Sequence, residues 1–196
     1  TEPFDLESRD GDSGFHEIPV EVEAADLRYA AKGYDPKAVQ QDRNAQIPVD
    51  RLLQYEANAV IGKLNEVWWS VSSWTPNARL VADEIAPMLS ERMHRYAVNA
   101  ALIVPASRLG VQTAGVIARE IETGGIPTIV ISVDKLAGER VRPPRTTFYD
   151  GEFGSVVGPA DWPQFQLRVL DETLRNMETF DQPGIKRLAV ELESKV

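Results

Sequence analysis

Two short apolar runs separated by an amphipathic helix constrain the fold of this 196-residue sequence more than any other feature. The first run covers residues 100–105, and the second covers residues 127–133. Between them, apolar side chains recur at helical spacing over residues 112–122, and Gly124-Gly125 provides a stop. Strands that are apolar along their whole length are typical of a parallel sheet covered on both faces. The pattern therefore predicts a strand, a crossover helix and a second, parallel strand.

The remaining chain predicts elements that can surround such a sheet. Alternating apolar residues from Ile18 to Val22 predict a short edge strand. Helical spacing predicts four further helices, which begin near Pro48, near Asn77, at Asp161 and at Pro183 or Gly184, the last one ending at Glu193. We therefore expect a single α/β domain with a mainly parallel sheet and helices on both faces, either Rossmann-like or flavodoxin-like.

Acidic residues are concentrated at the start of the sequence. Residues 1–26 hold nine acids and one base, and so contribute −8 to the net charge of −9. We expect residues 1–25 to form an acidic arm, either solvated or docked on a partner, and residues 26–196 to form the α/β domain. The rest of the chain is nearly neutral and has no basic cluster, so we expect no nucleic-acid partner.

The sequence contains no cysteine and only two histidines. Disulfides, thiolate ligands and sulfur nucleophiles are therefore excluded for these residues. His16 and His94 form no metal-binding signature, and we expect neither a metal nor a cofactor. Because there is no run of 18 apolar residues and no secretory signal, we expect a cytoplasmic protein that does not contact a membrane.

The turn that follows the first predicted strand lies where parallel sheets bind ligands, beyond the carboxyl ends of their strands. It lacks the glycines and the lysine of a phosphate-binding loop. On its chemistry alone, Ser107 is a turn residue or a helix cap, because neither histidine has a spacing that suggests a catalytic triad. Arg108, Gln112 and Thr113 lie beside it and are candidate substrate-binding residues.

Arg142 and Arg145, on either side of Pro143-Pro144, are the second candidate for binding. Two guanidinium groups on a rigid spacer can hold a carboxylate or a phosphate. We expect both to lie near the turn of residues 105–113, because they follow the second predicted strand. The competing interpretation is that they pair with nearby acidic residues, such as Asp134, Glu139 or Asp150.

Three tryptophans, Trp68, Trp69 and Trp74, fall within seven positions. One interpretation is a strand or loop that packs its rings into the core. The other is the wall of a pocket or a partner interface, where tryptophan is enriched.

Several short blocks, taken in order, resemble the selenoprotein B family of glycine, sarcosine, betaine and D-proline reductases. The resemblance covers about residues 26–178. The blocks are Asp26–Arg28, Asp42–Asn44, Pro48–Leu52, Val60–Gly62, Ala101–Pro105, Gln112–Gly125 and Val141–Arg145. The resemblance implies the reductase scaffold, in which a selenol or thiol attacks the substrate during reductive C–N cleavage.

The same resemblance implies that the reactive residues have been replaced in this chain. Ser107 stands at the position of the selenocysteine or cysteine, Gly110 at that of a second cysteine and Val111 at that of a histidine. A further family histidine corresponds to Trp68 or a neighbour. A serine hydroxyl cannot replace the thiol, because its pKa is far higher and it forms no intermediate that a reductant resolves.

Two hypotheses follow. In the first, the chain is a noncatalytic subunit that pairs with a Cys- or Sec-containing paralogue in a hetero-oligomer, with the tryptophans at the interface. In the second, it is an enzyme that binds a small anionic substrate through the Ser107 turn, Arg142 and Arg145, without thiol chemistry.

Overall fold

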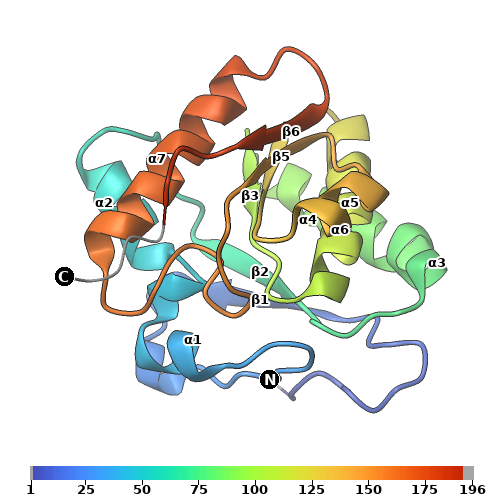
Figure 1. Cartoon of the computed structure of the whole chain (residues 1–196). Coiled ribbons are helices and arrows are strands. Elements are labelled where there is room, and N and C mark those ends of the chain that lie inside the picture. Colours follow the sequence, from blue (N-terminus) through green and yellow to red (C-terminus); the bar gives the residue numbers. More distant parts are fainter. Residues whose placement is uncertain (1, 192–196) are drawn as a thin grey trace.

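A parallel four-stranded sheet forms the centre of the fold in the computed structural model, which describes residues 2–191 (Figure 1). The strand order is β3-β4-β5-β6, and each neighbouring pair is parallel. The bounds are β3 Ala101–Ile103, β4 Thr128–Ser132, β5 Arg145–Phe148 and β6 Gly184–Arg187. The predicted α/β class with a mainly parallel sheet is confirmed.

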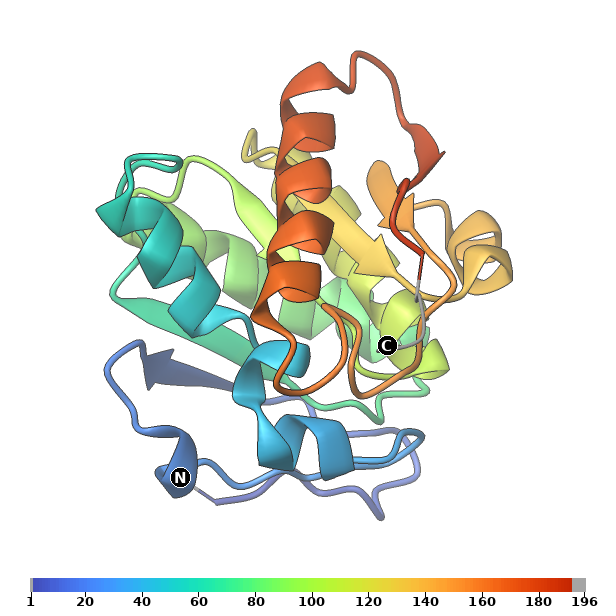
Figure 2. The same cartoon turned by 60° about the vertical axis from the view of Figure 1, so that its left-hand side comes forward.

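Helices cover both faces of this sheet, as predicted (Figure 2). On one face, α5 (Arg108–Thr123) packs between the sheet, α4 (Ala86–Arg95) and α6 (Lys135–Val141). On the other face lie α7 (Pro163–Thr179) and α2 (Val49–Ala57). The alternation of β4 explains this arrangement, because Val130 packs against α5 whereas Ile131 packs against α7.

An antiparallel ribbon and several short helical elements complete the described residues. The ribbon pairs β1 (Phe15–Pro19) with β2 (Val67–Val71), and its apolar side chains Phe15, Trp69 and Val71 pack on the core of α4 and α5. The helix predicted after Asn77 runs through α3 (Ala78–Leu80), the π-helical η3 (Val81–Ile85) and α4. The remaining elements are η1 (Ala24–Asp26), α1 (Lys37–Gln41) and η2 (Arg43–Ala45).

Two predictions about the C-terminal third were wrong. The helix expected from Pro183 or Gly184 is instead strand β6, which pairs with the edge that β5 would otherwise leave open, and residues beyond 191 lie outside the described residues. Tertiary pairing here overrides a weak local pattern. The cap expected at Asp161 is also wrong, since α7 begins at Pro163 after Trp162. Asp161 instead accepts a hydrogen bond from Gln41.

The acidic N-terminal residues lie against the rest of the chain. The backbone carbonyl of Asp10 accepts a hydrogen bond from the backbone of Asn77, and that of Leu6 accepts one from Lys32. Residues 15–19 belong to the ribbon. A boundary at residue 25 between an arm and a domain stays a prediction.

Candidate functional site

Ser107 lies just beyond β3 and caps the N-terminus of α5, where the sequence placed it. Its Oγ accepts a hydrogen bond from the backbone N–H of Gly110 at 2.9 Å and donates one to the carbonyl oxygen of Ser73 at 3.2 Å. The side chain of Ser107 therefore satisfies backbone groups, as an N-cap does. Only 1% of its surface is exposed.

Two glycines allow neighbouring segments to close over the Ser107 turn. Gly33, at φ +85°, lies so near that a Cβ there would be 3.4 Å from the Cβ of Ser107. On another side, the backbone N–H of Gly154 donates to the carbonyl of Ala106. A small molecule cannot reach the Ser107 hydroxyl unless one of these segments moves.

The histidines are engaged elsewhere. His16 stacks on the ring of Phe4. Both ring nitrogens of His94 contact backbone carbonyls, those of Ser90 and Gly124, at the far end of α5. Within residues 2–191, no group of three or more His, Cys, Asp or Glu side chains is arranged to hold a metal ion. The surroundings of Ser107 thus supply no histidine base for a serine nucleophile.

The other candidates on the turn do not converge on one point. Arg108 forms an ion pair with Asp134, the cap of α6, with 2.6 Å between Nε and the carboxylate. The pair lines a shallow depression of about 450 Å³ at the carboxyl edge of the sheet. Gln112 is exposed, whereas Thr113 is buried and donates to the carbonyl of Leu109.

Arg142 and Arg145 lie at the opposite end of the sheet, so the expectation that they approach the Ser107 turn was wrong. Helix α6, which was not predicted from the sequence, takes the chain back toward the other end of the sheet. Arg142 follows as the C-cap of this helix, in a left-handed conformation. Arg145 begins β5 and pairs with Glu122 at the C-terminal end of α5, at 2.5 Å. The competing interpretation, that the arginines pair with acids, therefore holds for Arg145. Its partner is Glu122, which the fold brings near, and not one of the acids close to it in the sequence.

The three tryptophans are half-buried and serve different contacts. Trp69 packs on the core, meets Tyr96 edge-on and donates to Glu17. Trp68 lies on the other face of β2, where strand alternation places it. Trp74 lies beneath the ammonium group of Lys32. Trp69 thus packs its ring into the core, as the first interpretation predicts. An interface role of the three tryptophans stays a prediction.

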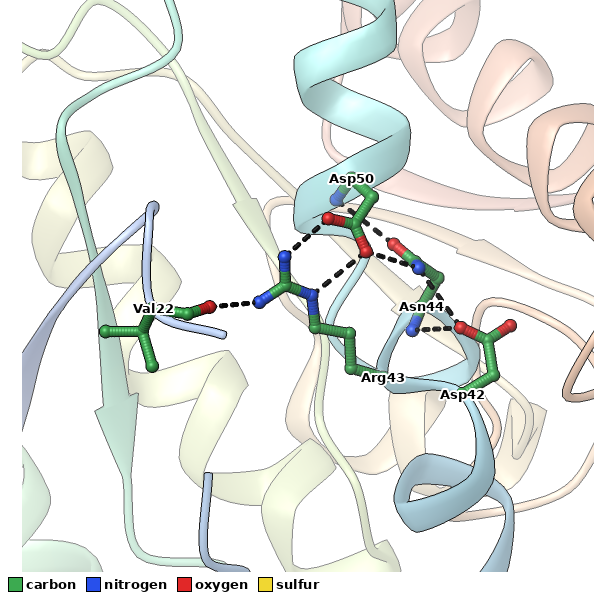
Figure 3. Close-up of polar contacts among 5 residues, drawn as sticks. All are labelled: Val22, Asp42, Arg43, Asn44 and Asp50. Carbon is green, nitrogen blue, oxygen red and sulfur yellow. Dashed lines mark hydrogen bonds and ion pairs between the residues drawn. The ribbon is translucent and has the colours of Figure 1, made fainter. Parts of the chain in front are cut away.

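A polar network that was not predicted as a site joins η2 and α2 to the segment that follows β1 (Figure 3). Arg43 donates to both carboxylate oxygens of Asp50 and to the carbonyl of Val22. Asn44 donates to Asp50 at 2.7 Å and to Asp42 at 3.1 Å. One feature of the sequence pointed to these residues. The blocks Asp42–Asn44 and Pro48–Leu52 are among those that resemble the selenoprotein B family, and the fold brings them together.

This network positions the residues that support the end of β3. Directly after it, the buried Gln46 donates to the carbonyl of Val104 and accepts from the backbone N–H of Val156. The carbonyl of Ala45 accepts a hydrogen bond from Val157. The network is thus a structural support of the Ser107 turn rather than a group of free catalytic side chains.

Comparisons with known proteins show what the chain is similar to. Residues 17–106, just under half of the chain, match the family model of glycine/sarcosine/betaine reductase selenoprotein B. The D-proline reductase subunit gamma of Acetoanaerobium sticklandii is 24% identical over 187 residues, which are 95% of this chain and 77% of that protein. The resemblance to the selenoprotein B reductase family is thereby confirmed.

Two further relatives are glycine reductase complex component B subunits gamma. That of Symbiobacterium thermophilum is 32% identical over 100 residues, half of this chain and 22% of the relative. That of Carboxydothermus hydrogenoformans is 25% identical over 154 residues, 75% of this chain and 34% of the relative. The chain therefore spans only a fifth to a third of these glycine reductase subunits. No solved structure matches the chain.

The segment matched by the selenoprotein B family model covers most of the ribbon, the polar network and β3. It ends one residue before Ser107. The correspondence of Ser107 to the selenol or thiol position therefore stays a prediction. No helix among the described residues is long and apolar enough to cross a bilayer.

Replacing Arg43 with alanine should lower the free energy of unfolding by about 2 kcal/mol, because it removes charge-assisted hydrogen bonds and leaves the Asp50 carboxylate without a cation, bonded to Asn44 alone among these side chains. Urea unfolding measures this loss. Arg95→Ala is the matched control, since Arg95 pairs with Glu91 on the exposed surface of α4 and should cost about 0.5 kcal/mol or less. Equal losses in the two variants would contradict the supporting role of the network.

The network should also make stability depend on pH. Hydrogen bonds from Arg43 hold the pKa of Asp50 below its ordinary value. A lowered pKa in the folded state stabilises the fold above the unfolded-state value of about 4, and this contribution is lost as the pH falls through the folded-state pKa. Solvent screening reduces the effect, because the Asp50 side chain is 41% exposed. Urea unfolding between neutral pH and about pH 3 should therefore show a smaller decline for Asp50→Asn than for the parent chain.

Proposed function

We propose that this chain is a noncatalytic subunit of a reductase-like complex related to glycine reductase and D-proline reductase protein B. In that complex it pairs with a paralogous subunit that carries the reactive cysteine or selenocysteine. The names of the relatives support the proposal, because each relative is a subunit gamma of such a reductase. We also propose that this complex works in the cytoplasm.

The observation that carries the proposal is the state of Ser107. Its hydroxyl group is buried and is hydrogen-bonded to the backbone of Gly110 and Ser73. A residue in that situation stabilises a turn and a helix end, and it has neither the access nor the base that a nucleophile needs. With no cysteine in the 196 residues, nothing in this chain can carry the thiol half-reaction.

The alternative, an enzyme that acts on a small anionic substrate without thiol chemistry, has less support. It requires the Ser107 turn, Arg142 and Arg145 to act on one ligand. The arginines lie at the other end of the sheet, and Arg145 is paired with Glu122. Arg108 remains on the turn, but Asp134 already neutralises it.

An activity assay tests the noncatalytic assignment. The purified chain should show no dithiol-dependent reduction of glycine, D-proline, sarcosine or betaine. The assay is repeated with the paralogue alone and with both chains together, and we expect turnover only when the paralogue is present. Turnover by the isolated chain, with contaminating reductases excluded by mass spectrometry, would show that it has chemistry of its own.

A further inference from the structure

We propose that residues 28–35 and the acidic segment of residues 5–12 form a two-layer strap that closes the Ser107 turn and opens without disturbing the rest of the fold. The inner layer is residues 28–35, and the outer layer is residues 5–12. Neither layer contains a helix or a strand. This inference does not depend on the proposed partner, because it concerns contacts within the chain.

The inner layer is attached to the Ser107 turn through Ser73. The carbonyl oxygen of Ser73 accepts the hydrogen bond of Ser107. The hydroxyl of Ser73 accepts a hydrogen bond from the backbone N–H of Lys32 at 3.3 Å and donates one to the carbonyl of Ala30 at 3.4 Å. One serine thus joins the turn to the strap, and both of its bonds to the strap are long. Gly33 then lies directly over Ser107.

Lys32 connects the inner layer to the outer layer. Its ammonium group donates to the carbonyl of Leu6 at 2.6 Å, lies 3.9 Å from the carboxylate of Glu7 and sits 4.2 Å above the ring of Trp74. The side chain of Lys32 is one-third exposed, so water can compete for these contacts. Lys32 is therefore the point at which the strap is most easily released.

The outer layer has anchors of its own next to Trp74. Gly11, at φ +93°, packs so closely on Thr75 that a Cβ at Gly11 would lie 2.5 Å from the Cα of Thr75. The carbonyl of Asp10 accepts a hydrogen bond from the backbone N–H of Asn77. These contacts hold residues 10–11 in place. Asp5 and Ser8 are hydrogen-bonded to Asp12 and Gly11, so the outer layer stays on this anchor when the inner layer separates from it at Lys32.

The far end of the inner layer rests on Gly154. A Cβ at Gly154 would lie 2.4 Å from the carbonyl oxygen of Asp35 and 3.0 Å from the ring of Tyr34. This close packing fixes one end of the strap, whereas the Lys32 end is held by polar contacts. Local opening should therefore begin at Lys32 and expose Ser107 without unfolding the sheet.

A single cysteine makes the strap measurable, because the natural sequence has none. The full-length Ser107→Cys variant is reacted with a thiol reagent, and the rate of thiol modification is measured. The rate is compared with that of Ser13→Cys, which places the thiol at an exposed position among the N-terminal residues. We expect the buried thiol to react about 100-fold more slowly, because the reaction waits for local opening. Comparable rates would overturn the proposal, since the turn would then be open.

The second part of the test releases the strap. Adding Lys32→Ala to Ser107→Cys should accelerate the reaction about tenfold, with the melting temperature nearly unchanged. Lys37→Ala is the matched control, because Lys37 is an exposed lysine whose ion-pair partner is Asp35 in the same segment. Equal rates for the Lys32 and Lys37 variants would overturn the role of Lys32.

Hydrogen exchange provides the same test if Ser107→Cys does not fold. The backbone N–H of Gly110 is bonded to the Ser107 hydroxyl, so its exchange reports on the turn in a chain that keeps Ser107. Faster exchange in Lys32→Ala than in Lys37→Ala supports the strap. Equal exchange in the two variants contradicts it.

Discussion

Replacing Gly154 with alanine should lower the free energy of unfolding by about 3 kcal/mol or more. Gly154 adopts φ +85°, a left-handed conformation that costs an L-residue about 1 kcal/mol or more. The added Cβ would also meet the carbonyl oxygen of Asp35 at 2.4 Å, and backbone atoms cannot move aside as a flexible side chain can. Since a domain is stable by only about 5–15 kcal/mol, this variant should be marginal.

Gly125 provides a matched control for this prediction. It has a similar φ of +91°, but a Cβ there would meet no atom within 4 Å. Gly125→Ala should therefore cost about 1 kcal/mol, from conformation alone. Urea unfolding of both variants isolates the packing contribution at Gly154. Equal losses would mean that the segments around the Ser107 turn are not packed as closely as described.

The double variant Ser107→Cys, Gly110→Cys should form an internal disulfide. By the resemblance, these positions hold the selenol or thiol and a second cysteine in related chains. A Cβ at Gly110 would lie 3.2 Å from the Oγ of Ser107 and 3.4 Å from the Cβ of Pro105. The two sulfur atoms can therefore come within bonding distance, and the helix N-terminus favours the thiolate that begins the exchange.

Intact mass measurement and thiol titration under denaturing conditions test this expectation. After treatment with oxidised glutathione, the double variant should lose both free thiols and return them on reduction. Each single variant is a control, because it can form only a mixed disulfide with glutathione. Two free thiols in the double variant after the same treatment would show that the turn no longer has the geometry of a dithiol motif.

Local patterns predicted the centre of the fold. The two apolar runs became β3 and β4, and the helix between them became α5. Ser107 could be placed from the sequence, because a small polar residue between a buried strand and an amphipathic helix is a cap. These features depend on residues that are close in the sequence, where periodicity and capping carry information.

Features that depend on distant residues could not be predicted in the same way. Arg145 was placed at the wrong end of the sheet, because the seven residues of α6 gave too short a periodic signal to show that the chain turns back. The contact of Gly33 with Ser107 and the hydrogen bond of Gln46 to Val104 join segments that are more than 50 residues apart. Such contacts follow from tertiary packing, for which a single sequence contains no local pattern.

The proposed role of this chain is that of a subunit beside a Cys- or Sec-containing paralogue. Native mass spectrometry detects such a complex, on the full chain expressed with and without the closest paralogue encoded in the same genome. We predict a mixed complex that persists at about 1 μM, where a dissociation constant in or below that range keeps it assembled. If the chain remains a monomer or a simple homodimer and does not bind the paralogue at that concentration, it is not a subunit of such a complex.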